Sequence, residues 1–198
     1  MITSYLCFYK QTKQTNEMKR KIAIIAGHSG AGTGANGFID EGKETIRLRD
    51  AVVARLRGAT AFEVITDRDK DKLPVVVAFL RKLLTPADIL IDIHFNASPA
   101  RLANGTQVFI PEKSTAVELE LAGILQKEMS KFFKNRGVGD ERDTYHKKIA
   151  MLSDVNTINL LLEVCFVTNE NDAKIYAKRF DEIADTIANF VKYVATKY

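Results

Sequence analysis

The residues best suited to chemistry are two histidines and a glutamate at or near the ends of apolar segments. His28 follows the run "KIAIIAG", His94 comes near the end of "DILIDIHFNA", and Glu163 lies inside "TINLLLEVCFV". An ionised carboxylate buried in an apolar strand is costly unless it has a cation, a hydrogen-bonded partner or a shifted pKa. A metal ion held by His28, His94 and a glutamate near the first helix would supply that cation.

Zinc is the metal that these residue types favour. Two imidazole nitrogens and one carboxylate oxygen, with a fourth position open to water, are the ligands of a catalytic zinc site. Such an ion activates water and stabilises the negative charge of a tetrahedral intermediate. Glu163 would then be the general base that moves a proton from the attacking water to a leaving nitrogen. A single histidine is more often structural, so the hypothesis depends on the residues occurring together.

The glycine-rich segment after His28 allows two other interpretations. Gly30, Gly32 and Ala35 satisfy the dinucleotide-binding pattern G-x-G-x-x-[GA]. Asp67 ends the next strand, as that fold would require. However, the pattern needs a helix that begins at once, and here an Asn-Gly pair comes first. A nucleophile at Ser29 is disfavoured because "GHSGA" lacks the last glycine of G-x-S-x-G.

The elements that position these residues alternate between strand and helix. Apolar runs predict strands at 21–27, 62–67, 88–97, 106–111, 149–152 and 157–167. Helical spacing of apolar residues predicts helices at 41–57, 72–84 and 114–134, a short one near Asn171, and a last one through 180–194. The polar segment 135–148 is expected to form a loop.

This alternation predicts one α/β domain, with a mostly parallel twisted sheet of about six strands and helices on both faces. Ligands bind outside the carboxyl ends of the strands in such sheets, which is where His28 and His94 are expected. Asn96, two residues after His94, would lie on the same face of its strand.

Composition agrees with a soluble globular domain of 198 residues, because 46% of residues are hydrophobic and 27% are charged. The net charge of +4 is small and no basic-aromatic module is visible, so no nucleic-acid partner is expected. Cys7 and Cys165 form no disulfide framework and are interpreted as buried or incidental thiols.

No segment predicts a membrane span. Residues 1–20 lack the apolar stretch of a secretory signal and are interpreted as a loosely ordered tail, or as an extension before a start at Met18. Synthesis in the cytoplasm without a recognisable signal peptide is therefore expected.

Five segments together resemble the zinc-dependent N-acetylmuramoyl-L-alanine amidases, the amidase-3 type of cell-wall hydrolase. They are "IAGHSG…EG", "LIDIHFNAS", "NGTQVFIPE", "NRGV" and "LLLEVCFVTNENDA". The resemblance runs from Lys21 to the carboxyl end in the family's order, so residues 21–198 are expected to be a zinc amidase catalytic domain. The family's common D-P-G-H-G-G reads IAGHSG here. The resemblance implies a peptidoglycan substrate, action at the cell wall or periplasm, and a Zn²⁺ cofactor.

Carried over to this sequence, the resemblance implies that His28 and His94 bind zinc and that Glu163 is catalytic. The remaining ligand is Glu41 or Glu44, and counting back without gaps from "LRDAVVARL" favours Glu41.

Two further residues are assigned in alternative ways. His146 is either an exposed loop histidine or a substrate contact at the cleft rim. Arg136 either binds a peptide carboxylate or anchors its loop. The chain is expected to be monomeric, and both a phage lysin and a host enzyme fit. The rival functions are a different zinc peptidase and a non-catalytic peptidoglycan-binding relative.

Overall fold

The computed structural model describes residues 19–28, 33–100 and 102–197, which form a six-stranded sheet covered by helices. The strand order is β2-β1-β3-β6-β4-β5, and only the pairing of β4 with β6 is antiparallel. The strands are β1 (Arg20–Ala26), β2 (Phe62–Ile65), β3 (Ile89–Asn96), β4 (Thr106–Ile110), β5 (Asn135–Asp140) and β6 (Ile158–Phe166). The predicted tail falls almost entirely outside the described residues.

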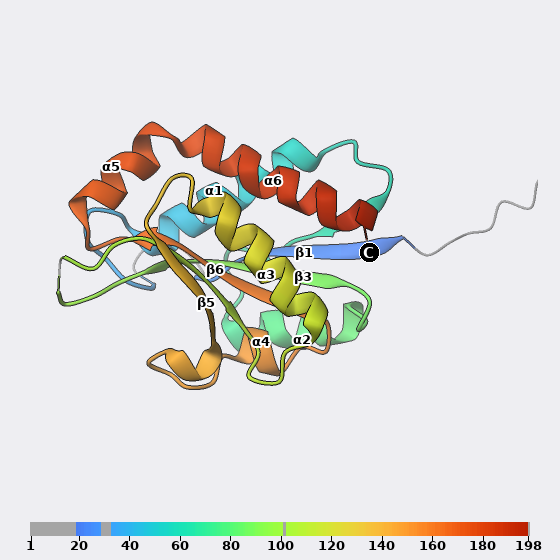
Figure 1. Cartoon of the computed structure of the whole chain (residues 1–198). Helices are drawn as coiled ribbons and strands as arrows, with labels where there is room; N and C mark the ends of the chain where they lie inside the picture. Colours follow the sequence, from blue (N-terminus) through green and yellow to red (C-terminus); the bar gives the residue numbers. More distant parts are fainter. Residues whose placement is uncertain (1–18, 29–32, 101, 198) are drawn as a thin grey trace, which may run out of the picture.

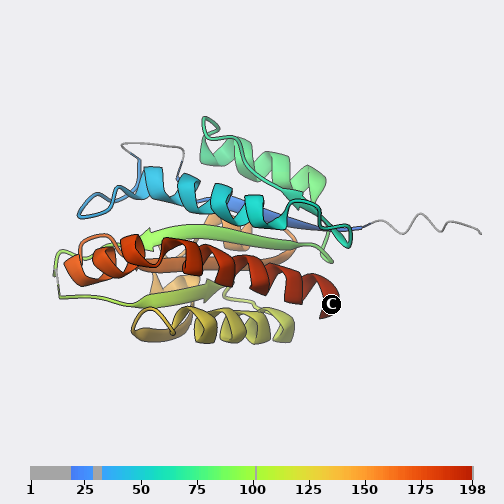
Figure 2. The same ribbon diagram turned by 90° about the horizontal axis from the view of Figure 1, so that it is seen from above.

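Helices cover both faces of the sheet, so the predicted fold class is confirmed (Figure 1). The helices are α1 (Glu41–Leu56), α2 (Leu73–Leu83), α3 (Ala116–Met129), α4 (Ala150–Ser153), α5 (Glu170–Lys178) and α6 (Phe180–Lys197). Helices α1, α6 and α3 lie side by side over one face, as the view from above shows (Figure 2). Helices α2 and α4 pack on the other face.

The apolar periodicity of the sequence explains these two layers. Leu48, Val52 and Leu56 recur every fourth residue on α1 and are all buried against the sheet. Neighbouring residues of β1 alternate between the two cores, with Ile24 facing α1 and Ile25 facing α2. Both faces of the central strands are therefore apolar, as expected for strands covered on each side.

Two predicted elements are wrong. The segment predicted as a loop at 135–148 begins with strand β5 and continues into a single 3₁₀ turn at Glu141–Asp143. β5 has almost no apolar alternation because it is an edge strand that pairs only with β4, through backbone groups. The segment predicted as a strand at 149–152 instead forms the short helix α4. A four-residue apolar run does not distinguish the two structures.

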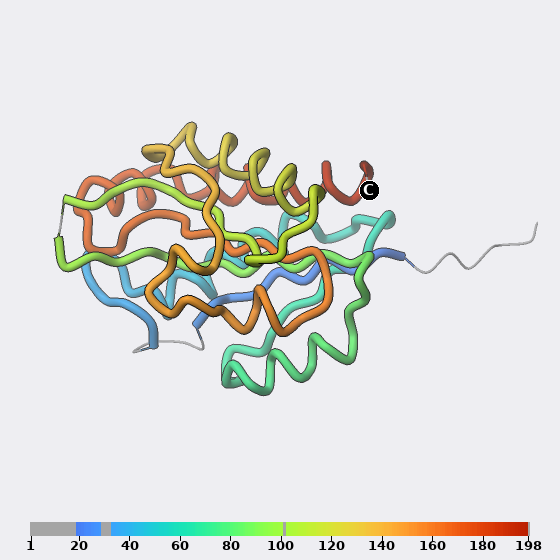
Figure 3. The backbone as a smooth tube through the Cα atoms, turned by 60° about the horizontal axis from the view of Figure 1, so that its bottom comes forward, coloured from blue at the N-terminus to red at the C-terminus, as the bar shows by residue number. Residues whose placement is uncertain are grey.

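The carboxyl ends of β1, β3 and β6 lie at the same end of the sheet, opposite the carboxyl end of α6 (Figure 3). The three strands are parallel neighbours, so residues that follow them come together although they are far apart in the chain. In the described part of the chain, none of the helices is long and apolar enough to cross a membrane.

Candidate functional site

The structure brings His28, Glu41 and His94 together at this end of the sheet. Glu41 Oε1 lies 3.2 Å from His28 Nε2 and 3.3 Å from His94 Nδ1. One nitrogen or oxygen atom from each residue lies within 4.8 Å of the others, which is close enough for all three to hold one metal ion. The two imidazole rings meet edge to face, with centroids 5.0 Å apart.

Three different elements position this triad. His28 follows β1 and His94 is in β3, while Glu41 is the first residue of α1, whose amino end is capped by Asp40. The Glu41 carboxylate is buried and accepts hydrogen bonds from the backbone N–H groups of Phe95, at 3.0 Å, and Ala35, at 2.7 Å. Glu41 therefore joins the start of the helix to the end of β3.

Glu44 has a different environment. Its carboxylate accepts a hydrogen bond from the Tyr176 hydroxyl at 3.0 Å and pairs with Arg47 at 2.9 Å. Among the described residues, the cluster that could hold a metal contains Glu41 and not Glu44. The geometry therefore agrees with the gap-free alignment to "LRDAVVARL".

The charges of Glu41 and His94 are strongly coupled. Burial alone would raise the pKa of Glu41, but its contacts with His28 and His94 lower that pKa well below the ordinary value. Burial would lower the pKa of His94, yet the carboxylates of Asp92 and Glu41 raise it well above the ordinary value. The carboxylate of Glu41 is thus held ionised, ready to pair with a cation.

Glu163 lies beside the triad. It is paired in register with His94 on the neighbouring strand, so the two side chains lie on the same face of the sheet. The register shifts between His94 and Asn96, where β6 carries an extra residue, and such bulges are common beside active sites. Glu163 Oε2 is buried and has no hydrogen-bond partner among the described residues. Burial raises the pKa of this carboxyl to about 7.

The raised pKa of Glu163 predicts how stability depends on pH in the metal-free chain. Between pH 4.5 and about pH 7, the folded chain keeps a proton that the unfolded chain has lost, so stability falls as the pH rises. Glu163→Gln removes this penalty. In the presence of a chelator, we expect the variant to melt above the wild type at pH 8 and by a smaller margin at pH 5. Thermal denaturation at both pH values measures this, and an equal margin would contradict it.

Sequence reasoning missed Asp92, which contacts the His94 side chain of the triad. Its Oδ2 atom lies 3.1 Å from His94 Nε2. The signal was present in the sequence, because a residue two positions before His94 shares its face of the strand. The same reasoning singled out only Asn96, on the other side of the histidine.

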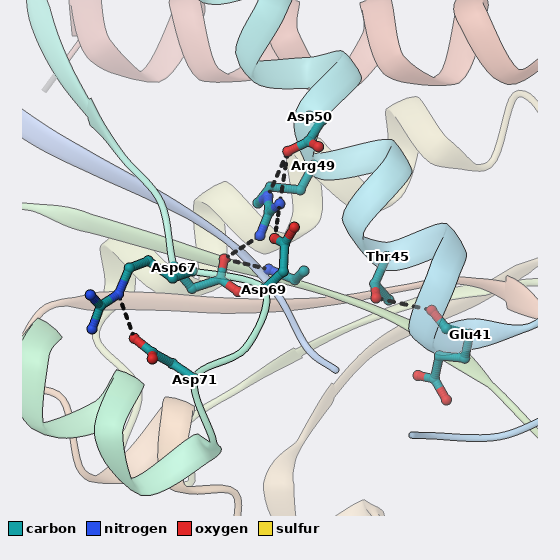
Figure 4. A network of polar contacts seen from close by, with 9 residues as sticks. Glu41, Thr45, Arg49, Asp50, Asp67, Asp69 and Asp71 are labelled. Atoms are coloured by element: carbon teal, nitrogen blue, oxygen red, sulfur yellow. Dashed lines mark hydrogen bonds and ion pairs between the residues drawn. The ribbon is translucent and has the colours of Figure 1, made fainter. Parts of the chain in front are cut away.

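A buried ion-pair network anchors α1 beside the triad (Figure 4). Arg49, two turns beyond Glu41, donates to Asp67 at 2.9 Å, and its guanidinium also contacts Asp50 and Asp69. Asp67 Oδ1 also accepts from the backbone N–H of Ala26, at the end of β1. Burial raises the pKa of Asp67, and the charge of Arg49 offsets part of this effect. Asp67 therefore has a structural environment here, rather than that of a nucleotide-binding carboxylate.

Removal of Asp67 is expected to destabilise the fold. Asp67→Ala leaves Arg49 with only its two exposed partners and leaves the Ala26 N–H without an acceptor, so the free energy of unfolding should fall by about 3 kcal/mol. Asp71→Ala is the matched control, because Asp71 pairs with the exposed Arg68 and should contribute less than about 1 kcal/mol. Urea denaturation compares the two variants, and equal losses would contradict the structural role of Asp67.

The triad and Glu163 open into a cleft of about 1120 Å³. His146 and Arg136 both line it. His146 is exposed and stacks edge to face on Tyr145, with centroids 5.3 Å apart. Arg136 donates to the Asn104 carbonyl at 3.4 Å and lies over the Phe166 ring. These two contacts of Arg136 hold it against the segment that contains Asn104. Arg136 also lines the cleft, so it lies beside any molecule that binds there.

The donor set of the triad fits zinc. Two imidazole nitrogens face one buried carboxylate oxygen, the donors that a catalytic zinc site would use, and all three residues line the cleft. The two positions singled out as possible alternatives, Ser29 and the Gly30–Gly32 segment, lie outside the described residues. Cys165 is buried, as predicted, and Cys7 also lies outside the described part.

Comparison with known proteins identifies a family. Residues 22–193 match the family model described as N-acetylmuramoyl-L-alanine amidase. A curated protein of Clostridium perfringens, described only as an uncharacterized 38.4 kDa protein, is 28% identical over 169 residues. That match covers 82% of this chain, which spans about half the length of the relative (48%).

Solved structures share the fold. An N-acetylmuramoyl-L-alanine amidase from Clostridium difficile 630 superposes with a TM-score of 0.74 at 22% identity, covering 91% of this chain and 99% of that one. The catalytic domain of the CD27L endolysin, which targets Clostridia difficile, gives 0.71 at 24% identity, with 88% and 97% covered. The catalytic domain of CwlV from Bacillus (Paenibacillus) polymyxa var. colistinus gives 0.71 at 22%, with 90% and 99% covered.

Proposed function

Because the chain belongs to the N-acetylmuramoyl-L-alanine amidase family, we propose that it hydrolyses peptidoglycan at the amide joining N-acetylmuramic acid to L-alanine. His28, Glu41 and His94 hold a zinc ion, and Glu163 is the general base. The observation that supports this most strongly is the meeting of two imidazoles and one buried carboxylate within 4.8 Å, beside a second carboxylate on the adjacent strand.

The chemistry follows from the positions of the side chains. Bound zinc supplies a Lewis acid that polarises the scissile carbonyl and acidifies water. Glu163, which lies beside the triad through its register with His94, accepts a proton from the water that attacks the carbonyl carbon. As the carbon–nitrogen bond breaks, Glu163 returns that proton to the alanine nitrogen, which leaves as a free amine.

A divalent cation held by the triad would favour the ionised form of Glu163, which is the form that accepts a proton. All four residues come from one chain, which supports activity as a monomer. A peptidoglycan substrate would place that activity at the cell wall.

Digestion of purified peptidoglycan tests the function. An amidase releases free stem peptides with an L-alanine amino terminus and leaves glycan strands without peptides. Mass spectrometry of the soluble products identifies both. Cleavage within the stem peptide would instead indicate a zinc peptidase with the same metal site, and binding without any soluble product would indicate a non-catalytic wall-binding protein.

A further inference from the structure

Asp92 is a buried carboxylate that the proposed reaction does not use directly. It lies in β3, is 1% exposed, and is flanked across the sheet by two apolar residues, Ile25 on β1 and Leu161 on β6. An ionised group in these surroundings is costly unless it is paired. The contacts of Asp92 should therefore include a group that stabilises its buried negative charge.

The contacts of Asp92 lead to His94. Its Oδ2 atom lies 3.1 Å from His94 Nε2, and its Oδ1 atom is buried without a hydrogen-bond partner among the described residues. Asp88, which immediately precedes the same strand, has different contacts, because its carboxylate accepts from the Lys21 N–H and from the N–H and hydroxyl of Thr85. Asp88 therefore holds backbone N–H groups in place, whereas the hydrogen-bond partner of Asp92 among the described residues is the side chain of His94.

The ring of His94 is also held from the side. It lies over Gly27 of the neighbouring segment, where a Cβ atom would be only 2.1 Å from His94 Nε2. The Gly27 N–H donates to the Ile93 carbonyl at 2.9 Å, so the backbone beneath the ring is fixed. The imidazole can therefore point Nε2 at Asp92 while Nδ1 points at Glu41, 3.3 Å away.

We propose that Asp92 is a positioning residue that fixes the tautomer and orientation of His94, so that Nδ1 carries the lone pair offered to the metal. This rests on the proposed function, in which His94 is a zinc ligand. With Nε2–H donating to the Asp92 carboxylate, the proton that a metal would displace from the ring is the one on Nδ1. A carboxylate behind a ligating histidine also makes that histidine a stronger donor. Within residues 19–28, 33–100 and 102–197, the His28 ring pairs with Glu41, whereas the His94 ring pairs with both Glu41 and Asp92.

Zinc affinity and the stability of the metal-free chain distinguish this role from a structural one. The proteins to compare are the wild-type chain, Asp92→Leu, Asp92→Asn and the control Asp88→Asn. Zinc affinity is measured by competition with a chromophoric chelator, and melting of the metal-free protein by circular dichroism. Asp92→Leu should bind zinc about 10- to 100-fold more weakly. Loss of one partner of a buried pair should also lower the melting temperature of the metal-free protein, so the variant is compared with Asp88→Asn, which is destabilised at a distance from the triad.

The other two variants complete the test. Asp92→Asn keeps an oxygen that can accept from Nε2–H, so it should lose less zinc affinity than Asp92→Leu. Asp88→Asn should melt at a lower temperature but bind zinc within about twofold of the wild type, because it lies at the far end of β3. Zinc affinities of both Asp92 variants within twofold of the wild type would overturn the proposal. A zinc affinity weakened equally in Asp88→Asn would also overturn it, because general destabilisation would then explain the loss.

Zinc binding and peptidoglycan digestion, both measured on the wild-type protein, separate this proposal from the proposed function. Wild-type protein that binds zinc but releases no stem peptides would overturn the assigned reaction and leave the role of Asp92 to be judged by its variants. Wild-type protein that binds no zinc would overturn both.

Discussion

Glu163→Gln is expected to lower the rate constant of peptidoglycan hydrolysis by about 10³-fold while leaving zinc binding unchanged. Glutamine has nearly the same shape as glutamate but cannot accept the proton from the attacking water. The measurement is release of free amino groups from purified peptidoglycan, together with the zinc content of each protein.

Glu163→Asp is the informative companion to this variant. It keeps the carboxylate but withdraws it by one methylene group, so it should retain more activity than the glutamine variant. A rate unchanged in Glu163→Gln would remove the proposed base. Loss of zinc from that variant would instead mean that Glu163 helps to hold the metal.

Glu41→Ala is expected to lower zinc affinity by more than the 10- to 100-fold typical of residues that merely support a ligand. Both histidines lie within 3.3 Å of the Glu41 Oε1 atom, so its loss removes an oxygen donor and leaves the imidazoles facing each other without a carboxylate. Hydrolysis should fall in parallel, and added zinc should restore part of it. Chelator competition gives the affinity.

Glu44→Ala is the matched control, three residues along the same helix. It should retain zinc and hydrolyse peptidoglycan at a rate within about twofold of the wild type, because Glu44 contacts Tyr176 and Arg47 instead of the triad. Because Glu41→Ala also leaves the N–H groups of Phe95 and Ala35 without an acceptor, Glu41→Gln provides a second variant of nearly native shape. Zinc loss in Glu44→Ala with zinc retained in Glu41→Gln would reverse the assignment.

Strong periodicity made most of the fold predictable from the sequence. Most predicted boundaries of the central strands and long helices agree with the observed ones to within about two residues, because each of these elements buries a continuous apolar face. Helix α3 is an exception, since it ends at Met129, earlier than predicted. β5 was missed for the opposite reason. It is held by backbone pairing to β4, and Gly137, at a φ of 86°, and Gly139 carry no side chains that could reveal a pattern.

The site was predictable in part for a related reason. His28 and His94 could be expected to meet because parallel strands end at a common edge. The choice between Glu41 and Glu44 depended on an alignment, since both lie in the first turn of α1, and only the fold shows which one faces β3. The pairing of Glu163 with His94 depends on strand order, and β3 and β6 are separated in the chain by two further strands.

That strand order also delays assembly of the sheet until most of the chain has left the ribosome. β3 and β4 follow one another in the sequence, but β6 inserts between them, so a nascent chain that stops before residue 158 has a gap at the centre of its sheet. Two rows of unsatisfied backbone groups then border the gap, and exposed edges of this kind favour aggregation. Prematurely terminated chains should therefore be insoluble and without hydrolytic activity, because the last strand to be synthesised both closes the sheet and carries Glu163.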